Sequence, residues 1–145
     1  MSEPGQHGGC LCGRVRYHYA GRLRPVVGCH CEQCRRTSGH FVAATQGHAE
    51  RLHVEDPGGA LRWYESSPGI HRGFCGVCGA SILWRRQGSG RISIMAGTLD
   101  APTGLRLVQH IFTAHAGDYY TIDPELPQSP EGDNVPEIPG NTTSD

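Results

Sequence analysis

The sequence contains no lysine, and all 13 of its basic residues are arginine. This absence excludes Schiff-base chemistry on a lysine amine. There is also no run of roughly 18 apolar residues, so no membrane-spanning helix is predicted. The first residues, MSEPGQHGG, lack a basic segment followed by an apolar one, and we therefore expect no secretory signal. A cytoplasmic location, where thiols are kept reduced, is the resulting expectation.

Charge is distributed unevenly along the chain. Six of the 14 acidic residues lie in residues 121–145, which contain no arginine, so the preceding 120 residues carry eight acids against 13 arginines, a formal charge of +5. Guanidinium groups pair with carboxylates in a planar fork, so small anionic substrates suit this composition. The acidic segment also holds five of the ten prolines and few large apolar residues, and we expect it to be disordered or draped on the surface.

Short strands account for most of the remaining pattern. Turn signals recur every roughly 8–12 residues, which is typical of an all-β fold. Alternating or short apolar segments predict strands over residues 14–20, 40–46, 51–55, 60–66, 70–75, 81–86, 91–97 and 107–113. Residues 28–39 are read as a loop with one helical turn. The predicted organisation is a flexible leader over 1–8, one zinc-binding domain over 9–120, and the Pro/acid-rich tail over 121–145.

All seven cysteines fall in three short motifs. These are Cys10-Leu11-Cys12, Cys29-His30-Cys31-Glu32-Gln33-Cys34 and Cys75-Gly76-Val77-Cys78. Zinc prefers thiolates in a tetrahedron, and closely spaced cysteines let one turn supply two ligands. Clustered cysteines in a reducing compartment bind metal more often than they form disulfides. A redox role for the CxxC pairs is disfavoured, because neither pair begins a helix within a βαβ pattern.

Counting divides the seven ligands into four and three. The first and last motifs together make a closed four-cysteine site, which is typical of structural zinc, whereas the central motif offers three thiolates and an open position, as catalytic zinc sites do. An alternative division joins the two CxxC pairs and leaves Cys10, Cys12 and Cys29 over. A further alternative is that both zinc ions serve folding, with His30 or a distant histidine completing the second shell.

Five segments resemble the glutathione-dependent formaldehyde-activating enzyme (GFA) family, also called the CENP-V/GFA domain. They are GGCLCGRVRY, GCHCEQCRRTSG, FCGVCGASI, MAGTLD and HIF, spread over roughly residues 8–120. The resemblance implies a mainly β fold, the β-tent, in which two facing antiparallel sheets carry zinc knuckles. It also implies two Zn2+ per chain, with Cys10, Cys12, Cys75 and Cys78 structural and with Cys29, Cys31 and Cys34 catalytic. One departure is that Tyr119 and Tyr120 stand where the family often has a tryptophan.

The implied activity is that of a carbon–sulfur lyase, which forms or cleaves S-hydroxymethylglutathione from glutathione and formaldehyde. Arg35 and Arg36 follow the last ligand of the open site and are predicted to offset its charge or bind the substrate; the alternative is a solvated surface role. His110, in the HIF segment, is predicted either to shuttle a proton or to be a buried structural histidine. His30, between two ligands, is expected to point away from the metal.

Two other functions fit the same sequence. The open zinc site would serve a thiol carrier without catalysis equally well. A zinc-stabilised module for protein or nucleic acid is permitted by the +5 charge, although the arginines are scattered and do not form a stripe. The sequence does not choose among thiols and aldehydes, and it does not set the oligomeric state.

Overall fold

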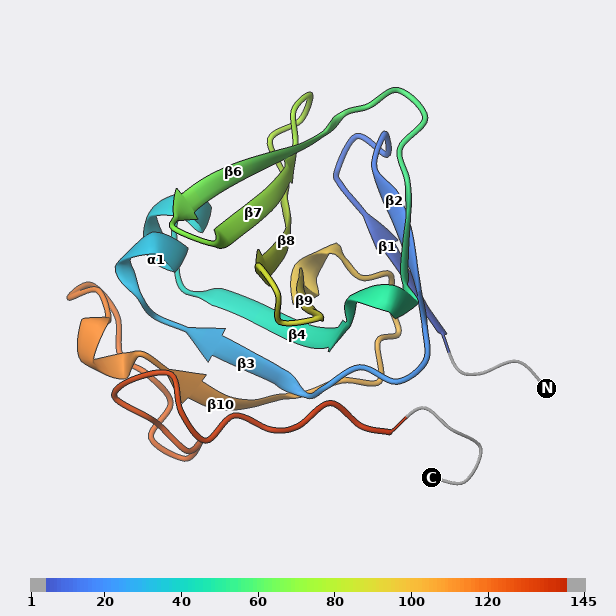
Figure 1. The fold of residues 1–145 in the computed structure, drawn as a ribbon. Coiled ribbons are helices and arrows are strands. Elements are labelled where there is room, and N and C mark those ends of the chain that lie inside the picture. The colour runs from blue at the N-terminus through green and yellow to red at the C-terminus, as the bar shows by residue number, and fades with distance from the viewer. Residues whose placement is uncertain (1–4, 141–145) are drawn as a thin grey trace.

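The chain is mainly β, and the computed structural model describes residues 5–140 (Figure 1). Ten strands in this range form two sheets. The smaller sheet has the order β1-β2-β5, with β1 (Gly5–Gly9), β2 (Arg16–Ala20) and β5 (Leu52–Glu55). The larger sheet has the order β10-β3-β4-β9-β8-β7-β6. Its strands are β3 (Val26–Cys29), β4 (Val42–His48), β6 (Leu61–Ser67), β7 (Ile70–Cys75), β8 (Ser81–Arg86), β9 (Arg91–Met95) and β10 (Leu107–Ile111).

Helical structure is confined to short segments. The helix α1 (Glu32–Ser38) follows β3, so the predicted single turn is a seven-residue helix. Two 3-10 turns, η1 (Ala49–Arg51) and η2 (Ala96–Thr98), connect strands, and a third, η3 (Thr113–His115), follows β10. Within the described residues, no helix is long and apolar enough to cross a membrane.

The main hydrophobic core lies between the two sheets. On β2, Tyr17 and Tyr19 point inward and are almost fully buried, as the alternation of residues 14–20 predicts. They pack in one cluster with apolar residues of β8 and β9, among them Ile82 and Ile94. The backbone of β4 can approach the Tyr19 ring this closely because residue 47 is glycine. A Cβ on Gly47 would lie 2.4 Å from that ring. The other face of the larger sheet is therefore left free of this core.

The predicted fold class is confirmed: two sheets pack face to face, and cysteine loops connect their strands. One detail differs, because β10 pairs with β3 in parallel while the other strand pairs of this sheet are antiparallel. The strand β3 is also missing from the prediction. Its four residues fall within or next to residues 28–39, the segment predicted to be a loop with one helical turn.

The flexible leader predicted over residues 1–8 is wrong for residues 5–8, which form most of β1. This strand could not be recognised from the sequence, because its glycines provide no alternating apolar face. Gly8 needs to be small, since a Cβ there would lie 2.3 Å from the Tyr17 hydroxyl oxygen. Residues 1–4 lie outside the described part of the chain.

The C-terminal segment runs beside β10 as an irregular chain (Figure 1). His110 N donates to Pro127 O at 3.0 Å, and Ser129 N donates to His110 O at 2.9 Å. Ser129 is buried, and its hydroxyl accepts from Gln109 Nε2 at 3.2 Å. These bonds satisfy the outer edge of β10, which would otherwise expose unpaired backbone groups. The domain boundary at residue 120 stays a prediction.

Candidate metal centres

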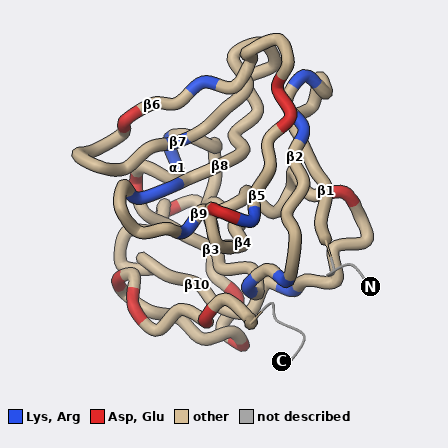
Figure 2. The backbone as a smooth tube through the Cα atoms, turned by 45° about the vertical axis from the view of Figure 1, so that its right-hand side comes forward, with Lys and Arg blue, Asp and Glu red and all other residues tan. Residues whose placement is uncertain are grey.

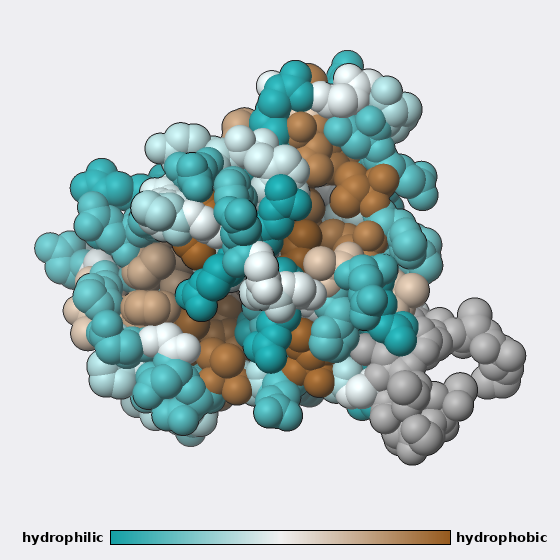
Figure 3. Space-filling model, in the orientation of Figure 1, coloured by the Kyte–Doolittle hydropathy of each residue, from teal (hydrophilic) through white to brown (hydrophobic). Residues whose placement is uncertain are grey.

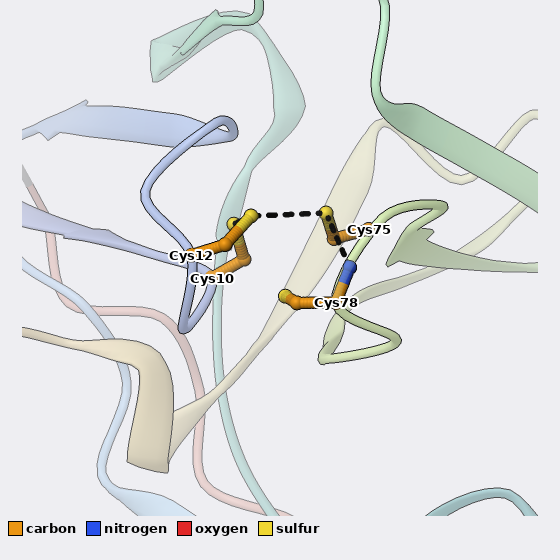
Figure 4. A group of neighbouring side chains, drawn as sticks. All are labelled: Cys10, Cys12, Cys75 and Cys78. Carbon is orange, nitrogen blue, oxygen red and sulfur yellow. Dashed lines mark hydrogen bonds between the residues drawn. The ribbon is translucent and has the colours of Figure 1, made fainter.

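The first cluster joins two distant loops. Cys10 and Cys12 lie in the loop after β1, and Cys75 and Cys78 lie at the end of β7 and in the loop that follows (Figure 4). Figure 4 shows the two pairs of thiols facing one another across the gap between these loops. Their four Sγ atoms lie within 4.8 Å of one another. The four-cysteine grouping that counting favours is therefore the grouping that the fold creates.

The spacing of these sulfur atoms fits a tetrahedral metal site. A zinc–sulfur bond of about 2.3 Å implies a sulfur–sulfur separation of about 3.8 Å in a tetrahedron. The observed separations are 3.6 Å for Cys10–Cys12 and 3.7 Å for Cys12–Cys75, far longer than a disulfide bond. The set of four thiols thus fits zinc with a closed shell.

Local hydrogen bonds to the sulfur atoms of this cluster stabilise the thiolate form. Val15 N donates to Cys10 Sγ at 3.3 Å, and Cys78 N donates to Cys75 Sγ at 3.4 Å. Backbone hydrogen bonds at Cys12 and then at Ala80 lower the pKa of Cys78 to about 6. Hydrogen bonds from the Arg14 backbone and side chain lower the pKa of Cys12. Because zinc binds the thiolate form, these donors favour metal binding.

The second cluster is built by one short segment. Cys29 ends β3, Cys31 is the N-cap residue of α1, and Cys34 lies in the first turn of that helix. The cap itself uses sulfur, since Cys34 N donates to Cys31 Sγ at 3.4 Å. The three Sγ atoms lie within 4.8 Å of one another, and in the described part of the chain no fourth His, Cys, Asp or Glu ligand atom joins them. Three thiols fit zinc with one position left for another ligand.

A positive charge stands beside this cluster. Arg72 of β7 places Nη1 3.9 Å and Nη2 4.0 Å from Cys34 Sγ. Its orientation is fixed by Ser66 Oγ, which accepts from Nε at 3.0 Å, and by Gln33 Oε1, which accepts from Nη2 at 3.3 Å. Hydrogen bonds from Cys29 and then Cys34, with a smaller effect of Arg72, lower the pKa of Cys31, whereas the pKa values of Cys29 and Cys34 are raised. Of the three thiols, Cys31 is therefore the one whose thiolate form is stabilised by its neighbours.

Two histidines form a buried network behind the second cluster. His30 Nε2 lies 2.8 Å from His110 Nδ1, and His30 Nδ1 lies 2.6 Å from Tyr120 Oη. Both histidines are almost fully buried, and burial lowers the pKa of His30 to about 4 and also lowers that of His110. His30 thus points away from the sulfur atoms into a neutral hydrogen-bonded chain. Tyr120, at the position where the sequence departs from the family pattern, completes this chain.

The second cluster opens onto a cavity of about 600 Å³, a volume typical of small-molecule sites. Its walls come mainly from the face of the larger sheet that does not pack on the smaller sheet, and Figure 3 shows apolar surface recessed between polar side chains. Gly132 and Val135 of the C-terminal segment also line the cavity. Besides the three cysteines, its lining includes four arginines and no acidic residue, and the arginines are Arg24, Arg72, Arg86 and Arg91.

The site residues predicted beyond the cysteines do not line this cavity. Arg36 forms an exposed ion pair with Glu32 at 2.9 Å. Arg35 packs near Gly117 on the other side of α1, and His110 is enclosed by the network described above. The four cavity arginines were missed. For Arg72 a signal existed, because period-two alternation in β7 places it on the same face as Ile70 and Phe74, where a charge is unusual.

Comparison with known proteins agrees with the geometry. The sequence model of the family "Glutathione-dependent formaldehyde-activating enzyme" matches residues 5–115. Among solved structures, the chain is similar to a Rhodobacter sphaeroides protein of known crystal structure, with a TM-score of 0.56 and 20% identity over 84% of this chain and 98% of that one. At this identity the likeness shows the fold alone, and no curated protein matches the sequence. Because the family match covers most of the 145 residues and all three cysteine motifs, the chain belongs to the glutathione-dependent formaldehyde-activating enzyme family.

Proposed function

We propose that this protein is a zinc-dependent carbon–sulfur lyase that forms and cleaves the adduct of glutathione, or a similar small thiol, with formaldehyde or another small aldehyde. One observation carries the proposal: the group of Cys29, Cys31 and Cys34 has three ligand atoms, no fourth in the described residues, and a cavity of about 600 Å³ beside it. The family name supports glutathione and formaldehyde as the reactants. The closed four-cysteine cluster is assigned a structural role.

The reaction needs a thiolate next to an aldehyde carbon. The thiolate sulfur forms a bond to the carbonyl carbon, the carbonyl electron pair moves to oxygen, and that oxygen takes up a proton to give a hydroxymethyl thioether. Cleavage is the reverse of these changes. When bound by Cys29, Cys31 and Cys34, a zinc ion would supply a Lewis acid that keeps the substrate thiol deprotonated. Apolar side chains of the cavity, such as Trp84 and Met95, would limit the access of water.

Charge compensation falls to Arg72 in this proposal. A group of three thiolates with a fourth sulfur is electron-rich, and Arg72 is the guanidinium that lies about 4 Å from Cys34 Sγ. It takes the place of Arg35 and Arg36, to which the sequence assigned this role. Because Arg72 is held by Ser66 and Gln33, its charge is oriented before the substrate arrives.

His110 acts as a positioning residue in this proposal. It bonds to His30, whose backbone N also donates to Ile111 O at 3.1 Å, so that β10 fixes the segment between Cys29 and Cys31. A Cβ on Gly28 would lie 2.6 Å from His110 Nδ1, which shows how closely the His110 ring packs on β3, the strand that ends at Cys29. The proton-shuttle role of His110 stays a prediction.

A rate measurement tests the proposal. Exchange between glutathione, formaldehyde and their adduct, followed by NMR with zinc-loaded protein, should be faster than in buffer. Arg72→Gln should slow this exchange by about tenfold or more, because it removes a charge-assisted interaction. Arg85→Gln is the matched control, since Arg85 lies on β8 with its guanidinium stacked 3.8 Å from the Trp63 ring, outside the cavity.

The outcomes separate the candidate functions. Exchange no faster than in buffer, with glutathione nevertheless bound, would refute the lyase and identify a thiol carrier. The nucleic-acid alternative receives no support from the charge arrangement, because basic residues are spread over several elements (Figure 2) and the cavity arginines enclose a space suited to a small molecule. The seven free thiols also suit the reducing cytoplasm that we propose as its location.

A further inference from the structure

Arg24 is a buried cation that has no anionic partner among residues 5–140. Its side chain lines the cavity, and the residue is 6% exposed. Its Nη2 donates to Ala44 O at 3.1 Å and its Nε donates to Pro25 O at 3.2 Å, so both bonds go to neutral carbonyls. Within residues 5–140, no carboxylate forms an ion pair with Arg24, Arg86 or Arg91. Buried charges are usually paired with an opposite charge, and among the described residues this one is not.

The guanidinium of Arg91 adds a second positive charge to that of Arg24. Arg91 begins β9 and also lines the cavity, and burial and then the nearby Arg91 charge lower the pKa of Arg24 to about 10. Arg24 is still positive at neutral pH. Two like charges facing one cavity without an acid between them create a site for an anion. A fork of guanidinium donors suits a carboxylate in particular.

The register of the sheet relates Arg24 to the thiols. Cys29 lies opposite Val42 on β4, and the Arg24 guanidinium is bonded to Ala44, two residues further along the same strand. Two strand residues span roughly 7 Å. This is the scale that separates a cysteine sulfur from a carboxylate a few bonds away in a small peptide. Cys29, Val42 and Ala44 all line the same cavity.

We infer that Arg24 and Arg91 form a carboxylate subsite, which selects thiols that carry a carboxylate a short distance from the sulfur. The inference rests on the proposed function and assigns its specificity. A carboxylate substrate would provide the anionic partner that Arg24 lacks within the described part of the chain, and a neutral thiol would provide none. The subsite thus excludes neutral thiols by the same interaction that binds glutathione.

Calorimetry on the zinc-loaded protein tests the subsite. The probes are glutathione, its diethyl ester, and the tripeptide in which serine replaces cysteine, which keeps both carboxylates and lacks the sulfur. Arg91→Gln and Arg24→Gln should each weaken glutathione and the serine tripeptide by about ten- to a hundredfold, the usual effect of losing one charged hydrogen bond. The ester should bind the unmodified protein more weakly than glutathione by a similar factor.

Arg85→Gln is again the control, because it removes the same charge from the other side of β8 and should leave all three affinities unchanged. Arg91 is exposed, so Arg91→Gln keeps the test valid even if Arg24→Gln is poorly folded. Equal affinity of glutathione for the Arg91→Gln variant and the unmodified protein, or equal affinity of the ester and glutathione, would overturn the subsite. Arginine-dependent binding of the serine tripeptide, without any tighter binding of glutathione, would support the subsite and refute the thiol site.

Discussion

Replacement of Cys75 by serine is expected to unfold the domain. Cys75 is fully buried, and its cluster connects the loop after β1 with the end of β7. Cys12 in that loop and Cys75 in β7 are 63 residues apart in the sequence. Metal binding at structural zinc sites contributes about 10 kcal/mol or more in small zinc-binding peptides. The whole stability of a typical domain is about 5–15 kcal/mol. Loss of this one ligand should therefore remove most of the stability of the fold.

Circular dichroism and zinc content measure this effect. The variant should show no cooperative thermal transition, or one lowered by tens of degrees. Val77→Ser is the matched control, because Val77 lies in the same loop, is 59% exposed and contributes no ligand. A Cys75→Ser protein that melts close to the unmodified one would contradict the structural role of the four-cysteine cluster.

Replacement of Cys31 by serine should have the opposite profile: it should remove a metal ion and leave the fold intact. The three ligands of this site lie within six residues of one another, so the metal there connects no distant elements. Serine is also a good N-cap residue, and its hydroxyl would replace the sulfur that accepts from Cys34 N. The helix α1 should therefore keep its first turn.

Zinc content should fall from two ions per chain to one in protein purified without chelator. The melting temperature should change by no more than about 4 °C, which corresponds to about 1 kcal/mol for a domain of this size. If Cys31→Ser unfolded as Cys75→Ser is expected to, the distinction between a structural and a functional site would fail. A single zinc ion in the undamaged, unmodified protein would refute the division into two sites.

Much of the architecture could be predicted from the sequence, because periodicity reports burial directly. The alternation at Tyr17 and Tyr19, and the bounds of β7 and β8, follow from side-chain pattern alone. The strand β1 could not be found this way, because its glycines carry no pattern and its place depends on pairing with β2. The strand β3 is only four residues long and leads straight into the ligand loop.

The two cysteine clusters were predictable and the positions of the cavity arginines were not, for one physical reason. Cysteines cluster by sequence spacing, which limits their possible partners. The sequence pattern around a strand arginine is the same whether its side chain faces solvent or a cavity. Arg35 and Arg36 were favoured for their nearness in sequence to Cys34, but the turn of α1 carries them away from the sulfur atoms. Arg72 reaches Cys34 through the folding of β7 over α1, so the alternation of β7 could mark this arginine as unusual but could not identify Cys34 as its neighbour.

The central claim is that the three-cysteine site takes the sulfur of a substrate thiol into its open position. Cobalt-substituted protein tests it most directly, because cobalt–thiolate charge-transfer bands report the number of sulfur ligands. Addition of millimolar glutathione should strengthen these bands in the unmodified protein and leave them unchanged in Cys31→Ser. Bands that stay the same in the unmodified protein would contradict the claim, because the open position would then be held by water or by the protein itself.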